Sequence, residues 1–418
     1  MKKIVICGGK SLSGQVQIHG AKNSLLPILA AVILCKGECV INNCPPLSDV
    51  LTMLELLQCI GCKVQYGNQR VHIDTSNISQ YKMDDNLMNK LRSSIFILGP
   101  LLARLQRAEL GYPGGCDIGI RPIDLHLKGL KDLGVQVVEK EGHIICSCKH
   151  LIGNEVYLDY PSVGATENIM MAASLAEGAT VIVNAAKEPE IVDLQNFINS
   201  MGGRISGAGS ARIVIHGVKE LIGTTYTPMA DRIVTGTFMI AAAVTKGDIY
   251  IKNACIDHVS CLAGKLRESG CYIKAEDKGI YIKSENRLLS SYLIETMPYP
   301  GFPTDLQSPM MSLQAVSKGT CIMVENVFEN RFRLAGELKK MGADITVKDR
   351  MAVIRGVKEL HGANVNTHDL RGGAALIIAG LCANGITVIN DKGLIDRGYF
   401  EFEKQLKDLG GDIVVLEE

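Results

Sequence analysis

The chain of 418 residues has no tryptophan, few aromatic residues and no excess of charge of either sign. Lysines and arginines number 44, as do aspartates and glutamates, so no global field draws the chain to nucleic acid or to a membrane surface. Aromatic residues make up 5% of the sequence, too few to favour the stacking surfaces of proteins that bind single strands. We therefore expect no nucleic-acid partner, and any anion-binding site has to be a local cluster of cations.

Long apolar runs are missing as well. The longest, Leu25 to Cys35, is about half of what a bilayer span requires. The N-terminal segment MKKIVICGGK contains two lysines, but its apolar run is too short for a secretory signal. A composition of 47% hydrophobic and 21% charged residues is typical of a globular protein, and the length favours two domains. We expect a cytoplasmic protein without membrane insertion.

The 14 cysteines show neither a metal-binding nor a disulfide pattern. Cys59 and Cys62 form a CxxC, and Cys146 and Cys148 form a CxC, but neither pair has a partner pair at a zinc-like spacing. Free thiols in a reducing compartment explain these cysteines better than a metal or redox site does. We expect no metal and no cofactor.

One cysteine stands in an unusual context. The stretch from Ala108 to Leu127, AELGYPGGCDIGIRPIDLHL, is rich in glycine and proline, which predicts a long mobile loop rather than a strand or a helix. It carries Cys116, with Arg121 a short distance further on. A cysteine near a guanidinium can act as an acid or a nucleophile. The alternative is a surface loop that happens to contain a cysteine, and one thiol does not decide between them.

An internal repeat organises the chain. A glycine follows an amphipathic, helix-like segment six times, at nearly constant intervals along the sequence. These glycines are Gly61, Gly134, Gly202, Gly270, Gly342 and Gly410. In five copies a second glycine, at a nearly fixed distance before the first, follows an Ala-rich segment and opens a β-branched one. These are Gly37, Gly178, Gly247, Gly319 and Gly385, and Arg107 stands in that place in the second copy.

Each copy predicts an apolar helix, a glycine, a strand, a second helix, a glycine and a further pair of strands. Six copies in register favour a repeat α/β architecture over chance. The second copy is irregular, because the interval from Arg107 to Gly134 is longer than the corresponding interval in every other copy. The additional residues lie in the Cys116 loop, which therefore occupies the segment that leads to a helix start and is a candidate lid.

Polar and charged residues gather where the predicted helices begin. Aspartate, asparagine and related residues are good caps, and capping accounts for Asn23, Asp49, Glu190 and Asp231. Cations are unfavourable at the positive end of a helix, by roughly 0.3–1 kcal/mol each. The cations in this register are Lys22, Arg92, Arg331, Arg371 and Arg397.

A solvated surface position explains any one of these cations but not the set. Helix starts are also ready sites for phosphate and carboxylate groups. Our hypothesis is that the helix starts converge on one cleft that binds a multiply anionic ligand.

Several long motifs resemble those of the UDP-N-acetylglucosamine 1-carboxyvinyltransferase family. They are GAKNSLLPILAA, LRSSIFILGPLLAR, PGGCDIGIRPIDLHL, SVGATENIM, DRIVTGTF, FPTDLQ, FENRF, HDLRGGAAL and IDRGYF, and they run from about residue 10 to the end. The resemblance implies an α/β fold of two inside-out α/β barrel domains, built from six repeated β/α units with three in each. It also implies a first domain at 22–229 that carries the Cys116 loop, and a discontinuous second domain at 1–21 plus 230–418.

The resemblance implies a transfer of the enolpyruvyl group of phosphoenolpyruvate to the 3′-hydroxyl of UDP-N-acetylglucosamine, the first committed step of peptidoglycan synthesis. An enol ether has to be protonated at its methylene carbon while an alcohol attacks the neighbouring carbon, so one acid and one base are needed. Cys116 matches the proton donor, which also forms a covalent adduct with phosphoenolpyruvate. Asp305 matches the base that takes the proton of the sugar hydroxyl.

The remaining matches concern binding of the two small-molecule substrates. Lys22, Arg121 and Arg397 match the residues that hold the phosphate of phosphoenolpyruvate, Arg331 and Arg371 match its carboxylate clamp, and Asn23 matches a further contact. Matches to UDP-sugar contacts are Asn23, Arg92, Arg121, Pro122, Ile123, Asp124, Leu125, Ser162, Val163, Gly164, Asp305 and Val327. Tyr160-Pro161 stands where some members have Lys-Val, so this chain lacks the lysine of those members at that place.

Two alternatives stay open at this point. A sister transferase acts on shikimate 3-phosphate, but its first helix start is expected to read Ser-Lys, and it lacks a loop of the Cys116 type. A non-catalytic paralogue that binds a nucleotide sugar predicts loss of the acid, the base or the clamp, yet Cys116, Asp305 and Lys22 are all present. The sequence leaves the oligomeric state open.

Overall fold

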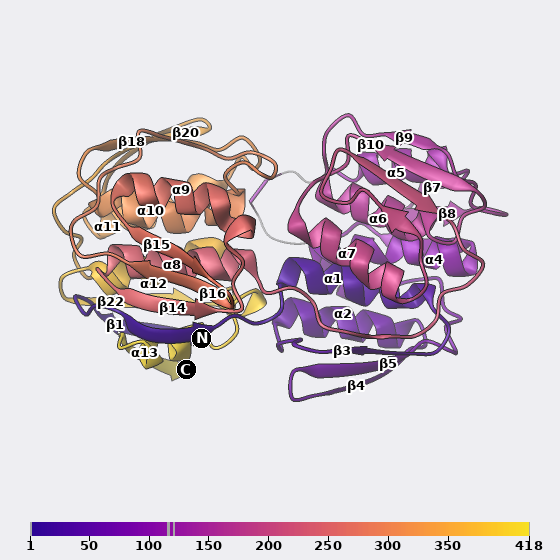
Figure 1. The fold of residues 1–418 in the computed structure, drawn as a ribbon, viewed down its shortest axis with the longest axis horizontal. Coiled ribbons are helices and arrows are strands. Elements are labelled where there is room, and N and C mark those ends of the chain that lie inside the picture. The colour runs from indigo at the N-terminus through magenta and orange to yellow at the C-terminus, as the bar shows by residue number, and fades with distance from the viewer. Residues whose placement is uncertain (1, 115–117, 120–121, 418) are drawn as a thin grey trace. The chain divides into compact units, whose positions relative to one another are not determined.

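The computed structural model describes residues 2–114, 118–119 and 122–417. Its contacts divide the described chain into two compact units, which are treated separately. Unit 1 consists of 2–18, 118–119 and 230–417, and unit 2 consists of 19–114 and 122–229. The fold is mixed α/β in both units (Figure 1).

Unit 2 contains three sheets, with strand orders β13-β3-β5-β4, β6-β8-β7 and β11-β12-β10-β9. Its helices are α1 (Lys22–Ala31), η1 (Val32–Leu34), α2 (Ser48–Cys59), α3 (Asp85–Lys90), η2 (Arg92–Ile97), α4 (Leu98–Leu105), α5 (Asp124–Asp132), α6 (Val163–Ala173) and α7 (Pro189–Ser200), where η marks a 3-10 helix. Its strands are β3 (Glu38–Ile41), β4 (Lys63–Gly67), β5 (Arg70–Asp74), β6 (Arg107–Gly111), β7 (Gln136–Lys140), β8 (His143–Ser147), β9 (Glu155–Tyr157), β10 (Ala179–Val183), β11 (Ile205–Ser206), β12 (Arg212–His216) and β13 (Thr225–Tyr226).

Unit 1 also contains three sheets, with strand orders β21-β22-β1-β23, β15-β16-β14-β2 and β17-β18-β20-β19. Its helices are α8 (Arg232–Val244), η3 (Ile256–Val259), α9 (Ser260–Ser269), η4 (Thr304–Leu306), α10 (Gln307–Val316), η5 (Arg331–Arg333), α11 (Leu334–Lys340), α12 (Leu370–Cys382), η6 (Ile395–Arg397) and α13 (Phe402–Asp408). Its strands are β1 (Lys2–Cys7), β2 (Ser13–Gln17), β14 (Asp248–Lys252), β15 (Tyr272–Glu276), β16 (Gly279–Lys283), β17 (Leu293–Glu295), β18 (Thr320–Val324), β19 (Asp344–Lys348), β20 (Met351–Arg355), β21 (Asn364–Asn366), β22 (Ile386–Asp391) and β23 (Asp412–Glu417).

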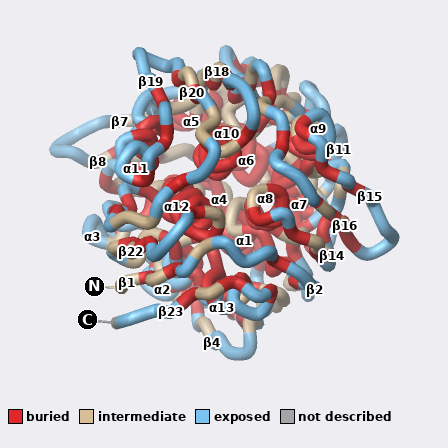
Figure 2. The backbone as a smooth tube through the Cα atoms, turned by 90° about the vertical axis from the view of Figure 1, so that its left-hand side faces the viewer, coloured by how far each residue is buried: buried red, intermediate tan, exposed pale blue. Residues whose placement is uncertain are grey.

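Three helices form the centre of unit 1. Helices α8, α10 and α12 pack against one another, and each is buried along almost its whole length (Figure 2). Gly236 of α8 permits close contact with η4, directly before α10, since a Cβ atom there would lie 2.6 Å from a methyl group of Leu306. The strands bury one face only, as alternate residues Ile249 and Ile251 show in β14. These helices are therefore the apolar inner layer that the sheets cover.

Most glycines of the repeat occupy the left-handed backbone region, and Gly247 is the exception. All six glycines that follow the second helix have φ between 89° and 111°, a conformation that strains other L-residues. In the second copy the left-handed residue is Gln106, with φ 59°, so the assignment of that place to Arg107 is wrong by one position. In the fourth copy Lys246 takes this conformation at φ 53°.

The last copy lacks a strand of its own. After Gly410 only β23 follows, and β1 from the N-terminus pairs with it antiparallel, opposite β22. Likewise β2 pairs in parallel with β14, which belongs to a distant part of the sequence. The prediction of a further strand pair in every copy is therefore wrong for the sixth, where the N-terminal segment supplies the missing strand.

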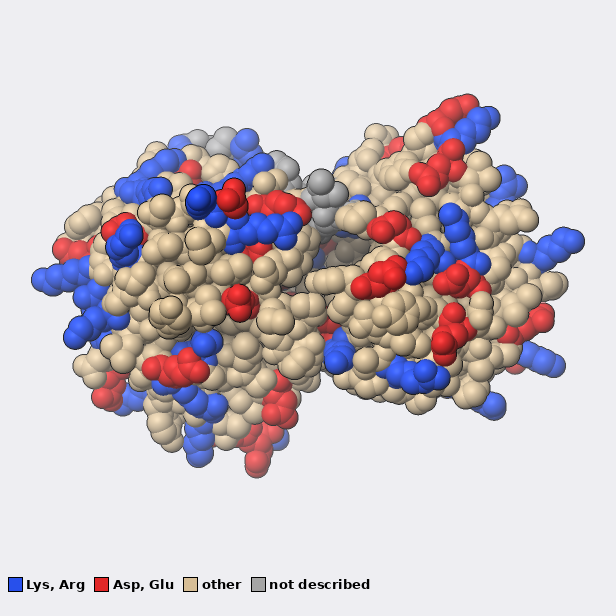
Figure 3. All heavy atoms as spheres, turned by 90° about the horizontal axis from the view of Figure 1, so that it is seen from above, with Lys and Arg blue, Asp and Glu red and all other residues tan. Residues whose placement is uncertain are grey.

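Two further findings concern the surface and the loop. The stretch predicted as a loop from Ala108 to Leu127 begins in β6 and ends in α5, so the loop prediction is wrong for 108–111 and 124–127. No helix among the described residues is long and apolar enough to cross a membrane. On the face seen in Figure 3, acidic and basic side chains are interspersed, as expected from their equal numbers.

The left-handed conformation of the glycine after each second helix predicts opposite effects of two glycine substitutions around α11. Gly342, with φ 91°, follows the helix, whereas Gly336 lies inside it with open space where an added methyl group would point. We expect Gly342→Ala to lower the free energy of unfolding by about 1–2 kcal/mol. Gly336→Ala should raise it by about 0.5–1 kcal/mol. Urea unfolding followed by circular dichroism measures both, and shifts of the same sign would contradict the backbone argument.

Candidate active site

Asp305 lies between two arginines in unit 1. Its carboxylate accepts hydrogen bonds from Nη2 of Arg331 at 2.6 Å and from Nη2 of Arg371 at 2.9 Å. Asp305 belongs to η4, directly before the buried helix α10, while Arg331 begins η5 and Arg371 is the second residue of α12. Three residues that the sequence assigned to the site, taken from three separate segments, are thus in direct contact.

Both guanidinium groups of this cluster are buried. The side chains of Arg331 and Arg371 are 3% and 2% exposed, against 23% for Asp305. Each guanidinium lies 5.2 Å from the centre of an aromatic ring, Arg331 over Phe328 and Arg371 over Tyr399. Charge pairing and ring contacts together offset the loss of water around the two cations. Asp305 is the part of the cluster that solvent or a ligand reaches most easily.

Each arginine retains a donor. Burial alone would lower the pKa of Arg371, but the nearby Asp305, Tyr399 and Asp231 outweigh it, so the pKa is raised and the group stays charged. Among the described residues, Nε of Arg331 and Nη1 of Arg371 are buried without a hydrogen-bond partner. Buried donors of this kind are costly unless they are satisfied. The guanidinium fork suits carboxylates and phosphates, so the cluster can bind a small anion.

Aspartates cap two of the buried helices. Asp231 accepts hydrogen bonds from two backbone N–H groups in the first turn of α8, at 2.8 and 3.0 Å. Asp369 does the same for α12 at 2.9 Å, and one of its two donors is the N–H of Arg371. The capping role predicted for Asp231 is therefore confirmed, and Asp369 also fixes the backbone that carries Arg371.

The predicted capping role is wrong for Asn23, Asp49 and Glu190. Each is the second residue of its helix, and the residues at the cap positions of these helices make no side-chain cap bonds. Asp49 instead forms an ion pair with Lys22, whose Nζ lies 2.7 Å from the carboxylate. The side chains of Lys22 and Asp49 are 12% and 6% exposed. Part of the negative charge expected near the cations at helix starts thus comes from the protein itself.

Two other predicted cations differ in their placement. Arg92 begins η2, as expected for a helix start, and its Nη1 donates to the carbonyl of Pro113 at 3.3 Å. Arg397 is the last residue of η6, and the next helix, α13, begins only at Phe402. The placement of Arg397 at a helix start is therefore wrong.

Glu325 is a structural centre that sequence reasoning missed. It is fully buried, and its carboxylate accepts hydrogen bonds from the hydroxyls of Thr296 and Thr304 at 2.8 and 2.9 Å. It also accepts from the backbone N–H of Val327 at 2.9 Å. Glu325 therefore ties the turn of Asp305 to the segment of Val327. No local pattern signals this role, because the residue simply follows a strand.

Seven further sugar-contact candidates of unit 2 lie at the starts of α5 and α6. Ser162 caps α6 and accepts from the N–H of Ala165 at 3.4 Å, and Val163 and Gly164 begin that helix. Pro122 and Ile123 precede α5, while Asp124 and Leu125 are its first two residues.

The α6 start lies against a histidine that sequence reasoning missed. A Cβ atom at Gly164 would lie 3.0 Å from the ring of His126, so glycine keeps the two helices in close contact. Burial first, and the charge of Arg92 second, lower the pKa of His126 to about 3, which keeps the ring neutral. Its ring lies 3.0 Å from the amide nitrogen of Asn168.

Cys116 and Arg121 lie outside the described residues. Of the intervening segment, Ile118 and Gly119 belong to unit 1 by their contacts. The carbonyl of Ile118 accepts a hydrogen bond from the N–H of Asn330 at 3.0 Å, directly before Arg331. Ile118 thus contacts the residue directly before Arg331 of the arginine cluster.

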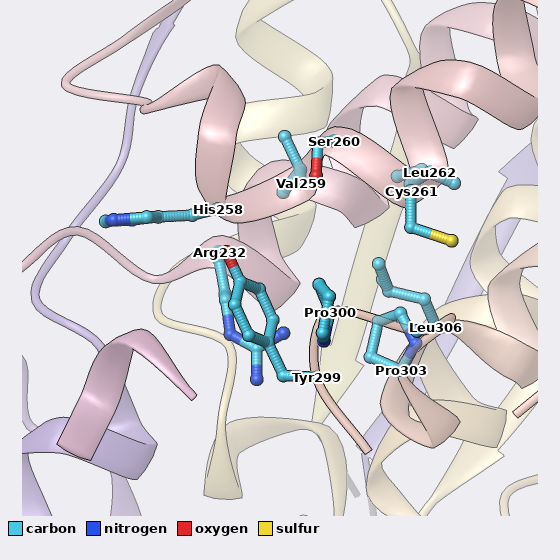
Figure 4. A pocket seen from close by; sticks show the side chains of 11 residues that line it. Arg232, His258, Val259, Ser260, Cys261, Leu262, Tyr299, Pro300, Pro303 and Leu306 are labelled. Carbon is cyan, nitrogen blue, oxygen red and sulfur yellow. The ribbon is translucent and has the colours of Figure 1, made fainter. Parts of the chain in front are cut away.

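A pocket adjoins the same 3-10 helix that carries Asp305 (Figure 4). Its wall includes Pro303 and Leu306, and the guanidinium of Arg232 lies 5.5 Å from the ring centre of Tyr299. Among the described residues that line this pocket, none is a predicted site residue. Among the described residues, no group of three or more His, Cys, Asp or Glu is arranged to hold a metal ion.

Known proteins resemble the chain over its whole length. Residues 6–406 match the family model "EPSP synthase (3-phosphoshikimate 1-carboxyvinyltransferase)". UDP-N-acetylglucosamine 1-carboxyvinyltransferase 2 of Caldanaerobacter subterraneus subsp. tengcongensis is 54% identical, with 99% of each chain covered. UDP-N-acetylglucosamine 1-carboxyvinyltransferase 1 of Clostridium acetobutylicum is 49% identical over the full length of both chains.

Among solved structures, the enolpyruvyl transferase NikO of Streptomyces tendae has the same fold, with a TM-score of 0.89, 23% identity, and coverage of 99% of this chain and 98% of that one. The family model shows the wider group, and the two relatives place the chain within it. The chain therefore belongs to the UDP-N-acetylglucosamine 1-carboxyvinyltransferase family.

Proposed function

We propose that this protein transfers the enolpyruvyl group of phosphoenolpyruvate to the 3′-hydroxyl of UDP-N-acetylglucosamine, with release of phosphate, as the first committed step of peptidoglycan synthesis. The names of the full-length relatives support this reaction. The observation that carries it is the contact of Asp305 with two buried arginines, each of which has one N–H donor without a hydrogen-bond acceptor. Such a cluster offers a base next to a site for a carboxylate.

In the proposed reaction, Cys116 and Asp305 move the protons. Asp305 takes the proton of the 3′-hydroxyl while the sugar oxygen bonds to C2 of phosphoenolpyruvate, and Cys116 gives a proton to the methylene carbon. Loss of phosphate and of one methyl proton then restores the double bond. Asp305 suits this role because it is the more exposed partner of its cluster.

The cations divide between the two acidic groups of phosphoenolpyruvate. Arg331 and Arg371 take the carboxylate with their remaining donors, Nε and Nη1. The phosphate goes to Lys22, Arg121 and Arg397, with Asn23 as a further contact.

The UDP-sugar is assigned to two groups of residues. Those of unit 2 lie at helix starts, where backbone N–H groups suit a diphosphate. They are Asn23, Arg92, Pro122 to Leu125 and Ser162 to Gly164. Arg121, which lies outside the described residues, is assigned to the same substrate. Asp305 and Val327 are the contacts from unit 1. Both belong to segments that Glu325 holds.

We also propose how the six repeats are distributed between the two domains. Each unit is an inside-out barrel of three repeats, supported by three sheets per unit and by the buried helices α8, α10 and α12. The domains are 22–229 and 1–21 plus 230–418. We place the protein in the cytoplasm, because the described cysteines are free thiols, which are typical of a reducing compartment.

Phosphate release tests the reaction directly. The full chain is incubated with phosphoenolpyruvate alone, with UDP-N-acetylglucosamine added, or with shikimate 3-phosphate added as a matched acceptor. We expect release only with the UDP-sugar. Release only with shikimate 3-phosphate would assign the chain to the sister reaction, and binding of the UDP-sugar without release would indicate a non-catalytic protein.

Asp305→Asn removes the charge of the proposed base but keeps its shape. Because general base catalysis contributes roughly 10²–10⁴-fold, we expect kcat to fall by about that factor while the Kd for UDP-N-acetylglucosamine changes little. Asp344→Asn is the matched control, since this exposed carboxylate pairs with Arg355 in the same unit and should leave kcat unchanged. Equal losses of binding and turnover at Asp305 would make it mainly a binding group.

The thiol assigned as acid predicts selective alkylation. Fosfomycin is an epoxide that alkylates the matching cysteine in family members, so intact-mass analysis should find one adduct and peptide mapping should place it on Cys116. Cys116→Asp keeps a proton donor and should escape the adduct while retaining turnover. Cys255→Ser, which removes an exposed thiol, should still be alkylated once. An adduct on the Cys116→Asp variant would refute the assignment.

A further inference from the structure

Two cysteine sulfur atoms lie close together in unit 2, and the proposed reaction assigns no role to either residue. Sγ of Cys35 and Sγ of Cys39 are 3.4 Å apart. Cys35 directly follows η1, and Cys39 is the second residue of β3. The turn between them contains Gly37 at φ 128°, a conformation that suits glycine alone. This tight turn places both sulfur atoms on the same inner side of the chain.

The environment divides the roles of the two thiols. The hydrogen bond with Cys39 acts against burial and, together with the hydroxyl of Thr75 and the charge of Arg104, lowers the pKa of Cys35 below that of an ordinary thiol. The same hydrogen bond, with burial, raises the pKa of Cys39. Arg104 is held in place because it donates to the carbonyls of Ile33 at 3.0 Å and Thr75 at 2.9 Å, and also to that of Cys35. One thiol therefore has nucleophilic character, and its neighbour holds a proton.

We propose that Cys35 and Cys39 form a site of reversible covalent modification, at which a disulfide oxidant such as oxidised glutathione produces an intramolecular disulfide. The thiolate of Cys35 attacks one sulfur of the oxidant, and the first glutathione leaves with the proton that Cys35 gave up. Cys39 then loses its proton, its sulfur bonds to Sγ of Cys35, and the second glutathione leaves with that proton. Two cysteine thiols are oxidised, and one glutathione disulfide is reduced to two thiols.

The geometry requires little movement. A disulfide has a sulfur–sulfur distance of about 2.0 Å, so the two sulfur atoms have to approach by roughly 1.4 Å. The CxxC that the sequence pattern singled out is less suited, because Cys59 is exposed whereas Cys62 is buried. The pair at Cys35 and Cys39 is thus better arranged for a disulfide than the CxxC motif.

Access sets the rate of this modification. Both thiols are fully buried, whereas Lys36 and Glu38 in the turn between them are exposed. The oxidant therefore reaches Cys35 only when this turn opens locally. The exposed thiols of Cys7 and Cys255 should react first, and the buried pair should follow.

Peptide mapping of the unmodified protein tests the proposal. The folded chain is treated with oxidised glutathione, free thiols are alkylated after denaturation, and tryptic peptides are analysed by mass spectrometry with and without reduction. Cleavage after Lys36 separates peptide 23–36, which contains Cys35, from peptide 37–63, which contains Cys39. We expect these two peptides to stay joined until reduction, with fragment ions placing the bond at Cys39. Cys35 and Cys39 should lose alkylation to equal extents.

The exposed thiols provide the internal control. If Cys7 and Cys255 carry glutathione while Cys35 and Cys39 are still fully alkylated after long incubation, the proposal is wrong. A bond from Cys35 to Cys62 would also overturn it. The readout is a peptide mass, so it is independent of the enolpyruvyl transfer.

Two variants sharpen the result. Cys39→Ser leaves Cys35 without its partner and should trap a glutathione adduct on Cys35 in place of the joined peptides. Cys62→Ser removes another buried thiol of the same unit and should leave the bond intact. A joined peptide pair in Cys39→Ser, or its loss in Cys62→Ser, would contradict the assignment.

Discussion

The burial of two guanidinium groups around one carboxylate is the constraint on which the site in unit 1 depends. Arg331 and Arg371 are almost without solvent contact, and such cations are stable only where an anion and hydrogen bonds replace water. Asp305 supplies that anion from a third segment. The starts of α8, α10 and α12 have to lie together for this contact, because they carry or adjoin Asp231, Asp305 and Arg371. Close packing of these three helices therefore brings Asp305 and Arg371 together.

The repeat could be predicted because a recurring backbone conformation restricts the residue type at that position. A left-handed residue after a helix favours glycine, so Gly61 and Gly342 appear in the sequence at regular distances. The signal fails where another residue accepts this conformation, as Gln106 does, and the predicted place then shifts by one position. It also fails where a strand comes from far away, as β1 does in the sixth copy, because pairing between distant segments leaves no local period.

The site was predictable only in part for a similar reason. Helix-dipole reasoning found Lys22, Arg331 and Arg371, but it could not say which side chain from another element balances each cation. The structure pairs Lys22 with Asp49, a residue that local reasoning had treated as a cap. Glu325 escaped notice because its role consists of contacts to separate segments rather than of a motif.

These pairings bear on how the proposed substrate would bind. Breaking the contact of Asp305 with its arginines would leave buried charge uncompensated, so an incoming carboxylate gains more by using the donors that are still unfilled. The proposed proton transfer then couples to that binding. When Asp305 takes the proton of the sugar hydroxyl, it loses its charge. Its ion pairs with Arg331 and Arg371 then weaken at the same time. Both guanidinium groups are then left to the carboxylate of phosphoenolpyruvate, so the step that activates the sugar also strengthens the hold on its reaction partner.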